Sequence, residues 1–294
     1  MASYIDMLDT SGVRVALSPV APNHGLKLGR FDLSPRIACN EQQSTMQKDF
    51  PQRFVGVVGI DPGEGVPESL VTLEYCVKNL GLRVATIEPG RQTFLAPNPA
   101  DKRLYDIYSL AQALEIPIII QTSGLKGGCS IDYAHPRWID QIAHDFPKLG
   151  IICAHACTPY ARELSCVIRR RSNVFASPDC YTFQDFSIWN SLATDVPNQL
   201  IFASGFPFCG NLEAFVMRYI AAPWNVKFID NIMYKNAIRA LRLEDTPYFS
   251  SMLEQPEILG PSARYRTRLE LLGHLGLTGK FRRMADLSKF WLRN

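Results

Sequence analysis

Seven short apolar runs recur along the chain between residues 10 and 245, separated by polar loops and by segments with helical periodicity. The runs are VRVALSP (13–19), FVGVVGID (54–61), RVATIEP (83–89), IPIIIQTS (116–123), LGIICAH (149–155), NVFASPD (173–179) and LIFASGF (200–206). They are almost continuously apolar and rich in β-branched residues, which is typical of strands buried on both faces of a parallel sheet. The sequence therefore predicts an α/β fold.

The segments between the runs predict helices. In 102–115, Ile107, Ala111 and Leu114 fall on one helical face, and in 136–147 apolar residues recur every four positions. Strands that alternate with helices in this way are typical of parallel βαβ units. At a length of 294 residues we expect these units to form a TIM-like (β/α) barrel rather than an open sheet.

The repeat contains seven strands, whereas a complete barrel of this kind has eight. The first helix, SYIDMLDTSG (3–12), is not preceded by a strand-like run. We therefore expect the first strand to be missing or atypical, with the open edge covered by another segment or chain. Residues 21–50 are polar and loop-like, and so long a loop is expected to cap a site. We expect a barrel over 1–245 and a helical extension over 246–294, packed on the barrel or on a partner subunit.

Composition excludes several classes of protein. The net charge of +3 is small, and no basic cluster with interleaved aromatics indicates a nucleic-acid partner. The longest apolar runs are too short to cross a bilayer, and the N-terminal residues lack a signal-peptide pattern. Eight scattered cysteines without a CxxC pair predict a reduced, cytoplasmic protein without structural zinc.

Several longer segments resemble one family. They are MLDTSGVRVALSP, FPQRFVGVVGIDP, PADKRLYDIYSLAQALEIPIIIQTSG, HPRWIDQIAHDFPKLGIICAHACTPY, NVFAS, NQLIFASGFPF and KNAIRALRL. In order and spacing they are similar to the amidohydrolase-related proteins of the amidohydrolase superfamily, which include aminocarboxymuconate-semialdehyde and γ-resorcylate decarboxylases. The resemblance covers about residues 5–243 and implies a TIM-like barrel.

The positions at which that family binds a divalent metal differ here. The family holds the metal with an HxH at the first strand, a His-Thr-Gly after the fifth and an Asp after the eighth. In this chain the HxH is absent, the second motif reads Gln121-Thr122-Ser123-Gly124, and Gly205 stands at the Asp position. Because a retained metal needs three or more suitable donors, we predict no bound zinc and no other cofactor.

Three strand-end residues are candidates for catalysis, because functional groups in such barrels project from the C-terminal ends of the strands. His155 matches the family's acid/base histidine after the sixth strand, so we expect it to be a general acid/base. Glu88 is expected to orient His155 or to act as a base, and Asp179 is a similar candidate. Two carboxyl groups facing one cavity would separate their pKa values and supply acid and base without a metal.

Four further residues are expected to contact the substrate: Gln121, Thr122, Lys126 and Ser204. The sequence GLKGG (124–128) lacks the Lys-Ser/Thr of a P-loop and instead predicts a flexible loop carrying Lys126. Lys27 and Arg30 on the long loop are additional candidates for holding an anionic group. Cys157 lies two residues after His155, a spacing that rarely forms a nucleophile–base pair.

Two functions from different classes fit these features, and a third is weaker. The first is a metal-independent enzyme that hydrolyses, decarboxylates or isomerises a small carboxylated molecule, with aromatic acids among the candidates. The second is a degenerate, non-catalytic subunit that pairs with a complete metal-binding relative. In either case we expect a homo- or hetero-oligomer with a related barrel. The third is a metal enzyme with relocated ligands such as His24 or His135.

Overall fold

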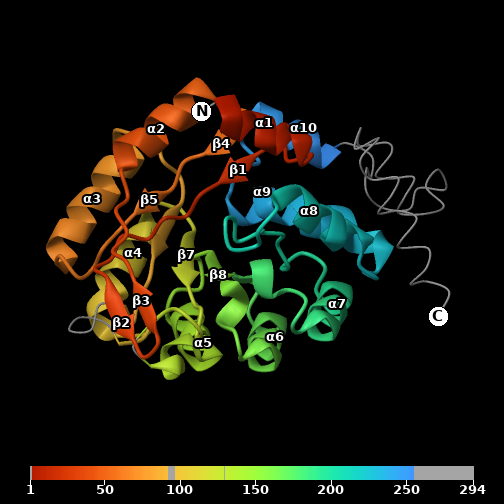
Figure 1. Cartoon of the computed structure of the whole chain (residues 1–294). Helices are drawn as coiled ribbons and strands as arrows, with labels where there is room; N and C mark the ends of the chain where they lie inside the picture. Colours follow the sequence, from red (N-terminus) through yellow and green to blue (C-terminus); the bar gives the residue numbers. More distant parts are fainter. Residues whose placement is uncertain (1, 92–96, 129, 255–294) are drawn as a thin grey trace.

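Five parallel strands form the continuous part of the sheet in the computed structural model, which describes residues 2–91, 97–128 and 130–254 (Figure 1). In spatial order they are β5 (Val58–Gly59), β6 (Ala85–Ile87), β7 (Ile118–Gln121), β8 (Ile151–Ala154) and β9 (Val174–Ser177). Ile120 pairs with Cys153, which pairs in turn with Ala176. This order and register confirm the parallel βαβ arrangement, and the carboxyl ends of the strands therefore meet at one edge.

The remaining strand-like runs are less regular. β4 (Phe54–Val55) precedes β5 in the same run and pairs in parallel with β1 (Ala16–Leu17). Run 200–206 was expected to be a strand, and this prediction is wrong: one bridge, from Ala176 to Leu200, joins it to β9. On the side of the run that faces away from β9, the Phe202 amide donates to the Ile232 carbonyl instead of to a strand. Residues 200–206 therefore do not form a regular strand.

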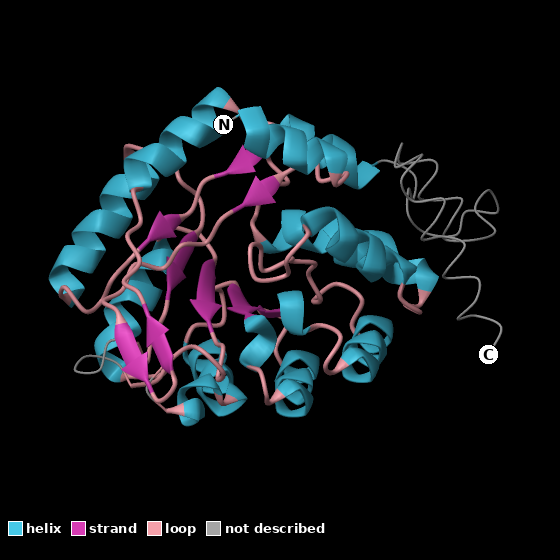
Figure 2. Cartoon of the chain, viewed as in Figure 1, coloured by secondary structure: helices cyan, strands magenta, loops and turns pink. Residues whose placement is uncertain are grey.

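Ten α-helices lie within the described residues, and most of them cover the outer side of the strands (Figure 2). They are α1 (Ala2–Thr10), α2 (Asn40–Asp49), α3 (Val66–Lys78), α4 (Tyr105–Ala113), α5 (Pro136–Asp145), α6 (Ala161–Arg170), α7 (Phe186–Asp195), α8 (Leu212–Ala221), α9 (Asn236–Ala240) and α10 (Pro247–Glu254). The helices predicted in 102–115 and 136–147 are confirmed as α4 and α5. In α5, Pro136 occupies the first turn and His135 Nδ1 accepts the Arg137 amide, so the helix start is capped.

The long segment 21–50 is more structured than the sequence suggested. It contains an antiparallel hairpin of β2 (Leu26–Leu28) and β3 (Phe31–Leu33), followed by α2. A bridge between Asn23 and Arg36 closes the base of the hairpin. The prediction that the segment is loop-like is wrong for these elements, because two short strands can pair locally in a pattern too brief to recognise in sequence.

The chain after the repeat begins with α10. Its Phe249 and Met252 are buried together with Leu241 and Leu243 in an apolar cluster that also includes the barrel-facing Ile152. Residues 255–294, the rest of the predicted helical extension, lie outside the described residues. Among the helices described here, none has both the length and the apolarity that crossing a bilayer requires.

The wall of the barrel is open at one place. Within the described residues no hydrogen-bonded ladder joins segment 13–19 to segment 200–206, although they are the first and last strand-like segments of the repeat. On the outside, α1 contacts α8 across this gap (Figure 1). Within the described residues the wall therefore has no ladder across this gap, and the missing or atypical first strand stays a prediction.

A close approach at Gly59 in β5 provides a test of the packing. A Cβ at this position would lie 2.4 Å from Ala38 Cβ and 2.7 Å from the Val20 carbonyl oxygen. We expect Gly59→Ala to lower the free energy of unfolding by about 1–3 kcal/mol through overpacking. Gly150→Ala is the control, since its new Cβ would stay 3.3 Å from Pro117. Equal denaturation midpoints for the two variants would contradict the close packing at Gly59.

Candidate active site

Two of the predicted catalytic residues meet at the carboxyl edge of the sheet. His155 follows β8 and Asp179 follows β9, and their Nδ1 and Oδ2 atoms lie 2.5 Å apart. His155 Nδ1 makes no hydrogen bond, so we treat the contact as electrostatic, strongest when the imidazole is protonated. Asp179 is buried, whereas the His155 side chain is partly exposed. The ring can therefore exchange protons with a bound molecule through Nε2 while the carboxylate holds Nδ1.

The backbone that presents these two residues is in an unusual conformation. His155, Ala156 and Cys157 have φ of 65°, 45° and 56°, and Asp179 has φ of 44°. Left-handed backbone at four non-glycine residues is unfavourable by about 1–3 kcal/mol each, and such strain concentrates at functional sites. Thr122 supports the turn, because its hydroxyl donates to the Ala154 carbonyl and accepts the Cys157 amide.

Glu88 is the centre of a second, buried polar cluster. It is 3% exposed and accepts hydrogen bonds of 2.8 Å from Asn23 Nδ2 and Arg36 NH1. Arg91 NH1 lies 3.6 Å from the same carboxylate and donates to Asn23 Oδ1. Burial raises the pKa of Glu88, although Arg36 and Arg91 oppose that shift. Two guanidinium groups beside one carboxyl group leave at least one net positive charge.

This cluster gives Glu88 partners other than His155. Glu88 contacts Asn23 and Arg36 of the hairpin segment, whereas Asp179 contacts His155. The role of Glu88 in orienting His155 or acting as a base stays a prediction. Arg36 comes from the hairpin base and reaches the cavity wall, where His155 also lies. Asn23, Arg36 and Arg91 were missed by sequence reasoning because they come from loops. The pairing of Asn23 with Arg36 brings these two to the end of β6, whereas Arg91 follows β6 directly in the chain.

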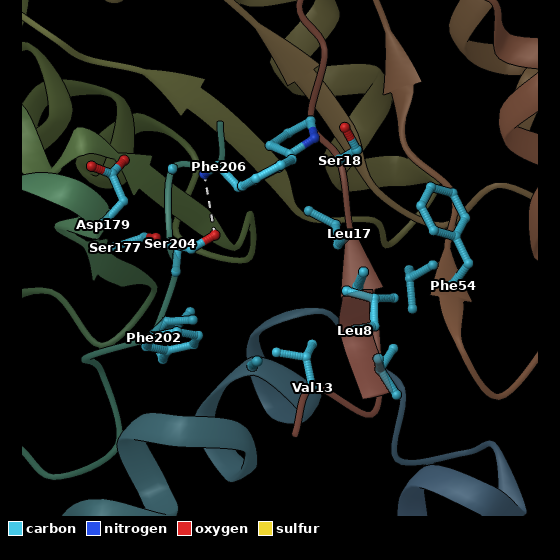
Figure 3. A pocket seen from close by; sticks show the side chains of 18 of the residues that line it. Leu8, Val13, Leu17, Ser18, Phe54, Ser177, Asp179, Phe202, Ser204 and Phe206 are labelled. Carbon is cyan, nitrogen blue, oxygen red and sulfur yellow. Dashed lines mark hydrogen bonds between the residues drawn. The ribbon is translucent and has the colours of Figure 1, made fainter. Parts of the chain in front are cut away.

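The cavity containing His155 has a volume of about 970 Å³. Figure 3 shows Asp179, Ser177 and Ser204 on one side of it and Ser18 and Leu17 on the other. Of the residues expected to contact substrate, Gln121 and Ser204 line it. Gln121 Nε2 donates to the Pro19 carbonyl, and Ser204 Oγ accepts the Phe206 amide.

The other predicted contact residues lie elsewhere. Thr122 is fully buried and holds the His155 turn, so it lies behind the cavity wall. Lys126 is exposed, with its ammonium 5.4 Å from the Phe31 ring centroid and 5.8 Å from that of Phe208. Lys27 and Arg30 are exposed on the hairpin and do not line the cavity.

Tyr181 and two thiols complete the surroundings of His155. The Tyr181 ring meets the imidazole edge-on at 5.8 Å, and its hydroxyl is 3.2 Å from Ser123 Oγ. Burial, with the nearby Asp179 charge, raises the pKa of Cys180 to about 12. Burial raises the pKa of Cys209 in the same direction. Both thiols therefore stay protonated near neutral pH and are poor nucleophiles.

The donor set does not fit a divalent metal. Within the described ranges no group of three or more His, Cys, Asp or Glu side chains is placed to hold one. Gly205 offers no donor, and a Cβ there would lie 3.4 Å from Asp179 Cγ. His135 caps α5 and packs against Tyr160, so the hypothesis of relocated ligands finds no support in this geometry. The absence of bound zinc stays a prediction.

Comparison with known proteins places the chain in a family. Residues 14–243 match the family model described as amidohydrolase. The chain belongs to the amidohydrolase family. No curated protein matches it in sequence.

Solved structures share the fold of this amidohydrolase. An uncharacterised TIM-barrel protein from Bordetella bronchiseptica is 23% identical over 82% of each chain, with a TM-score of 0.68. The 2,6-dihydroxybenzoate decarboxylase from Rhizobium is 13% identical over 82% of this chain and 88% of its own, with a TM-score of 0.63. The 5-carboxyvanillate decarboxylase from Novosphingobium aromaticivorans, complexed with manganese and a nitrobenzoic acid, is 14% identical over 82% and 79%, with a TM-score of 0.62. These similarities show the TIM-barrel fold.

The buried cluster around Glu88 gives a testable stability difference. Glu88→Gln keeps the shape but leaves the Arg91 guanidinium, whose side chain is 1% exposed, without a counter-charge. We expect a loss of about 3–5 kcal/mol in the free energy of unfolding. The double variant Glu88→Gln/Arg91→Met should recover part of it. Glu74→Gln, which removes the exposed pair with Lys78, should lose less than about 1 kcal/mol. Equal losses for the two single variants would contradict the role of burial.

Proposed function

We propose that this amidohydrolase is an enzyme that acts on a carboxylated substrate, by decarboxylation in preference to hydrolysis or isomerisation, and that it does so without a bound metal. One observation carries the proposal: His155, held by Asp179, shares a cavity with Arg36. A proton carrier and a fixed positive charge around one cavity suit a substrate that is an anion and must gain or lose a proton. The decarboxylase and hydratase names among the structural relatives support this substrate class.

In the proposed reaction Arg36 holds an anionic substituent of the substrate. Glu88 positions the Arg36 guanidinium and limits its freedom, since the two are joined by a 2.8 Å ion pair. His155 in its protonated form donates from Nε2 to the unsaturated carbon that carries the carboxylate, and a π electron pair of the substrate forms the new carbon–hydrogen bond. The carbon–carboxylate bond then breaks, its electron pair restores the π bond, and CO₂ leaves. The imidazole regains a proton from water, and the Asp179 carboxylate stabilises the imidazolium at the start of each turnover.

Removal of the proton carrier is the first test. We expect His155→Gln to lower kcat by about 10²–10⁴-fold on whichever benzoate or vanillate acid is turned over, because general acid catalysis contributes that much. The assay is CO₂ release with product detection on a panel that includes 2,6-dihydroxybenzoate and 5-carboxyvanillate. His144→Gln, an exposed change on α5, is the matched control. An unchanged kcat for His155→Gln would contradict the proposal.

Metal dependence is the second test. Because the donor set around His155 is incomplete, we expect activity to survive extended treatment with a chelator. We also expect elemental analysis of the purified chain to find far less than one equivalent of manganese or zinc. The reference is a manganese-containing decarboxylase treated in parallel. If the rate of CO₂ release falls to background after chelation and returns with added Mn²⁺, the hypothesis of a metal-independent reaction is wrong.

A non-catalytic subunit is the second candidate function. It is favoured by the incomplete donor set of the described residues, because a metal-binding relative paired with this chain would supply the missing ligands. In that case no acid on the panel is turned over, and the chain raises the kcat or the thermal stability of a complete relative on mixing. Sedimentation of the chain alone and in the mixture distinguishes this candidate from the enzyme.

A further inference from the structure

A second pocket lies at the opposite end of the strands from His155. We call it the amino-end pocket, because Gly150 and Asn173, which directly precede β8 and β9, line it together with Ala240 at the end of α9. Its volume of about 520 Å³ is within the range of small-molecule sites. Among the described residues it shares no lining with the cavity at His155, and none of its lining comes from the two segments that flank the gap in the barrel wall.

Arg242 is held in place at the edge of the amino-end pocket. Its NH1 donates to the Glu115 carbonyl over 2.8 Å, and its NH2 donates to the Lys148 carbonyl over 2.6 Å. These carbonyls belong to the connections that follow α4 and α5. Both acceptors are neutral, so the hydrogen bonds fix the half-buried guanidinium without neutralising its charge.

The amino-end pocket has an excess of positive charge. Lys148, Arg239 and Arg242 line it, and Glu115 is the one carboxylate among the described lining residues. Within the described part of the chain these three cations form no ion pair, and Asp245 pairs with Arg83 instead. Three positive charges against one negative charge give a net charge of +2. The carboxyl ends of α4 and α9 contribute about half a negative charge each, which does not cancel this excess.

We propose that the amino-end pocket binds the phosphate group of a small molecule. Guanidinium groups bind phosphate oxygens through paired N–H donors, and a dianion matches the excess charge better than a single carboxylate does. Phosphate alone fills only part of the pocket, and the ring of Phe175 in its lining offers apolar surface to the organic part of a phosphate ester. This binding site goes beyond the proposed function and is independent of it.

Isothermal titration calorimetry with the full chain tests the proposal. The probes are inorganic phosphate and phenyl phosphate slightly above neutral pH, where both are mostly dianions. We expect one phosphate probe or both to saturate a single site. Tighter binding of phenyl phosphate would identify an organic phosphate as the source, and equal binding would identify free phosphate. Heats that do not saturate, as adventitious ion binding gives, would overturn the proposal.

Variants of the two exposed cations locate the site. Lys148→Met and Arg239→Met should each raise Kd about two- to fivefold, as expected for exposed charge pairs, and the double variant should raise it about tenfold. Arg242→Met removes the fixed guanidinium and should raise Kd at least about tenfold. Lys48→Met and Arg162→Met, which remove exposed cations on α2 and α6 outside the pocket lining, are the matched controls and should leave Kd unchanged. Thermal melts check the folding of every variant.

A further variant separates the amino-end pocket from the cations near His155. Arg36→Gln should leave the Kd of the phosphate probes unchanged, because Arg36 lines the other cavity. If the double variant Lys148→Met/Arg239→Met binds phosphate as the unmodified chain does, the proposal is wrong, whether or not Arg36→Gln is folded. Turnover of an acid without phosphate binding would contradict this proposal alone. Phosphate binding at the amino-end pocket without turnover would contradict only the proposed function.

Discussion

The parallel ladder from β6 to β9 is the constraint on which the rest of the structure depends. Its register aligns the ends of these strands, so that Glu88, Gln121, His155 and Asp179 all leave the sheet at one edge. The strands are buried on both faces, and the hydrogen bonds between them cannot be exchanged for water without unfolding. The edge is therefore rigid enough to support left-handed turns at His155 and Asp179, which the local sequence alone would not favour.

The two buried carboxyl groups at this edge have different partners. Asp179 lies against His155, and Glu88 lies against Arg36 and Arg91. The separation matters because Gly205, at the family's metal-binding Asp position, faces Asp179 closely enough that a second carboxylate there would be repelled. This separation is what the proposed proton transfer at His155 and the proposed anion binding at Arg36 require.

The gap in the barrel wall has a consequence for the interior. A complete barrel fills its centre with layers of side chains. Here the first and last strand-like segments have no ladder between them within the described residues, and the interior is continuous with the cavity at His155. The α1–α8 contact covers the gap from outside.

The sequence by itself determined the fold class, the parallel order of the strands and the position of His155 and Asp179 at strand ends, because apolar periodicity and β-branched runs are local properties. It also revealed the empty donor position at Gly205. Only the tertiary structure decided which carboxylate contacts His155, because that depends on how two loops turn after their strands. It likewise decided that Asn23, Arg36 and Arg91 gather around Glu88 and that run 200–206 lacks a full ladder. These features arise from contacts between residues far apart in the chain, whose pairing no local pattern specifies.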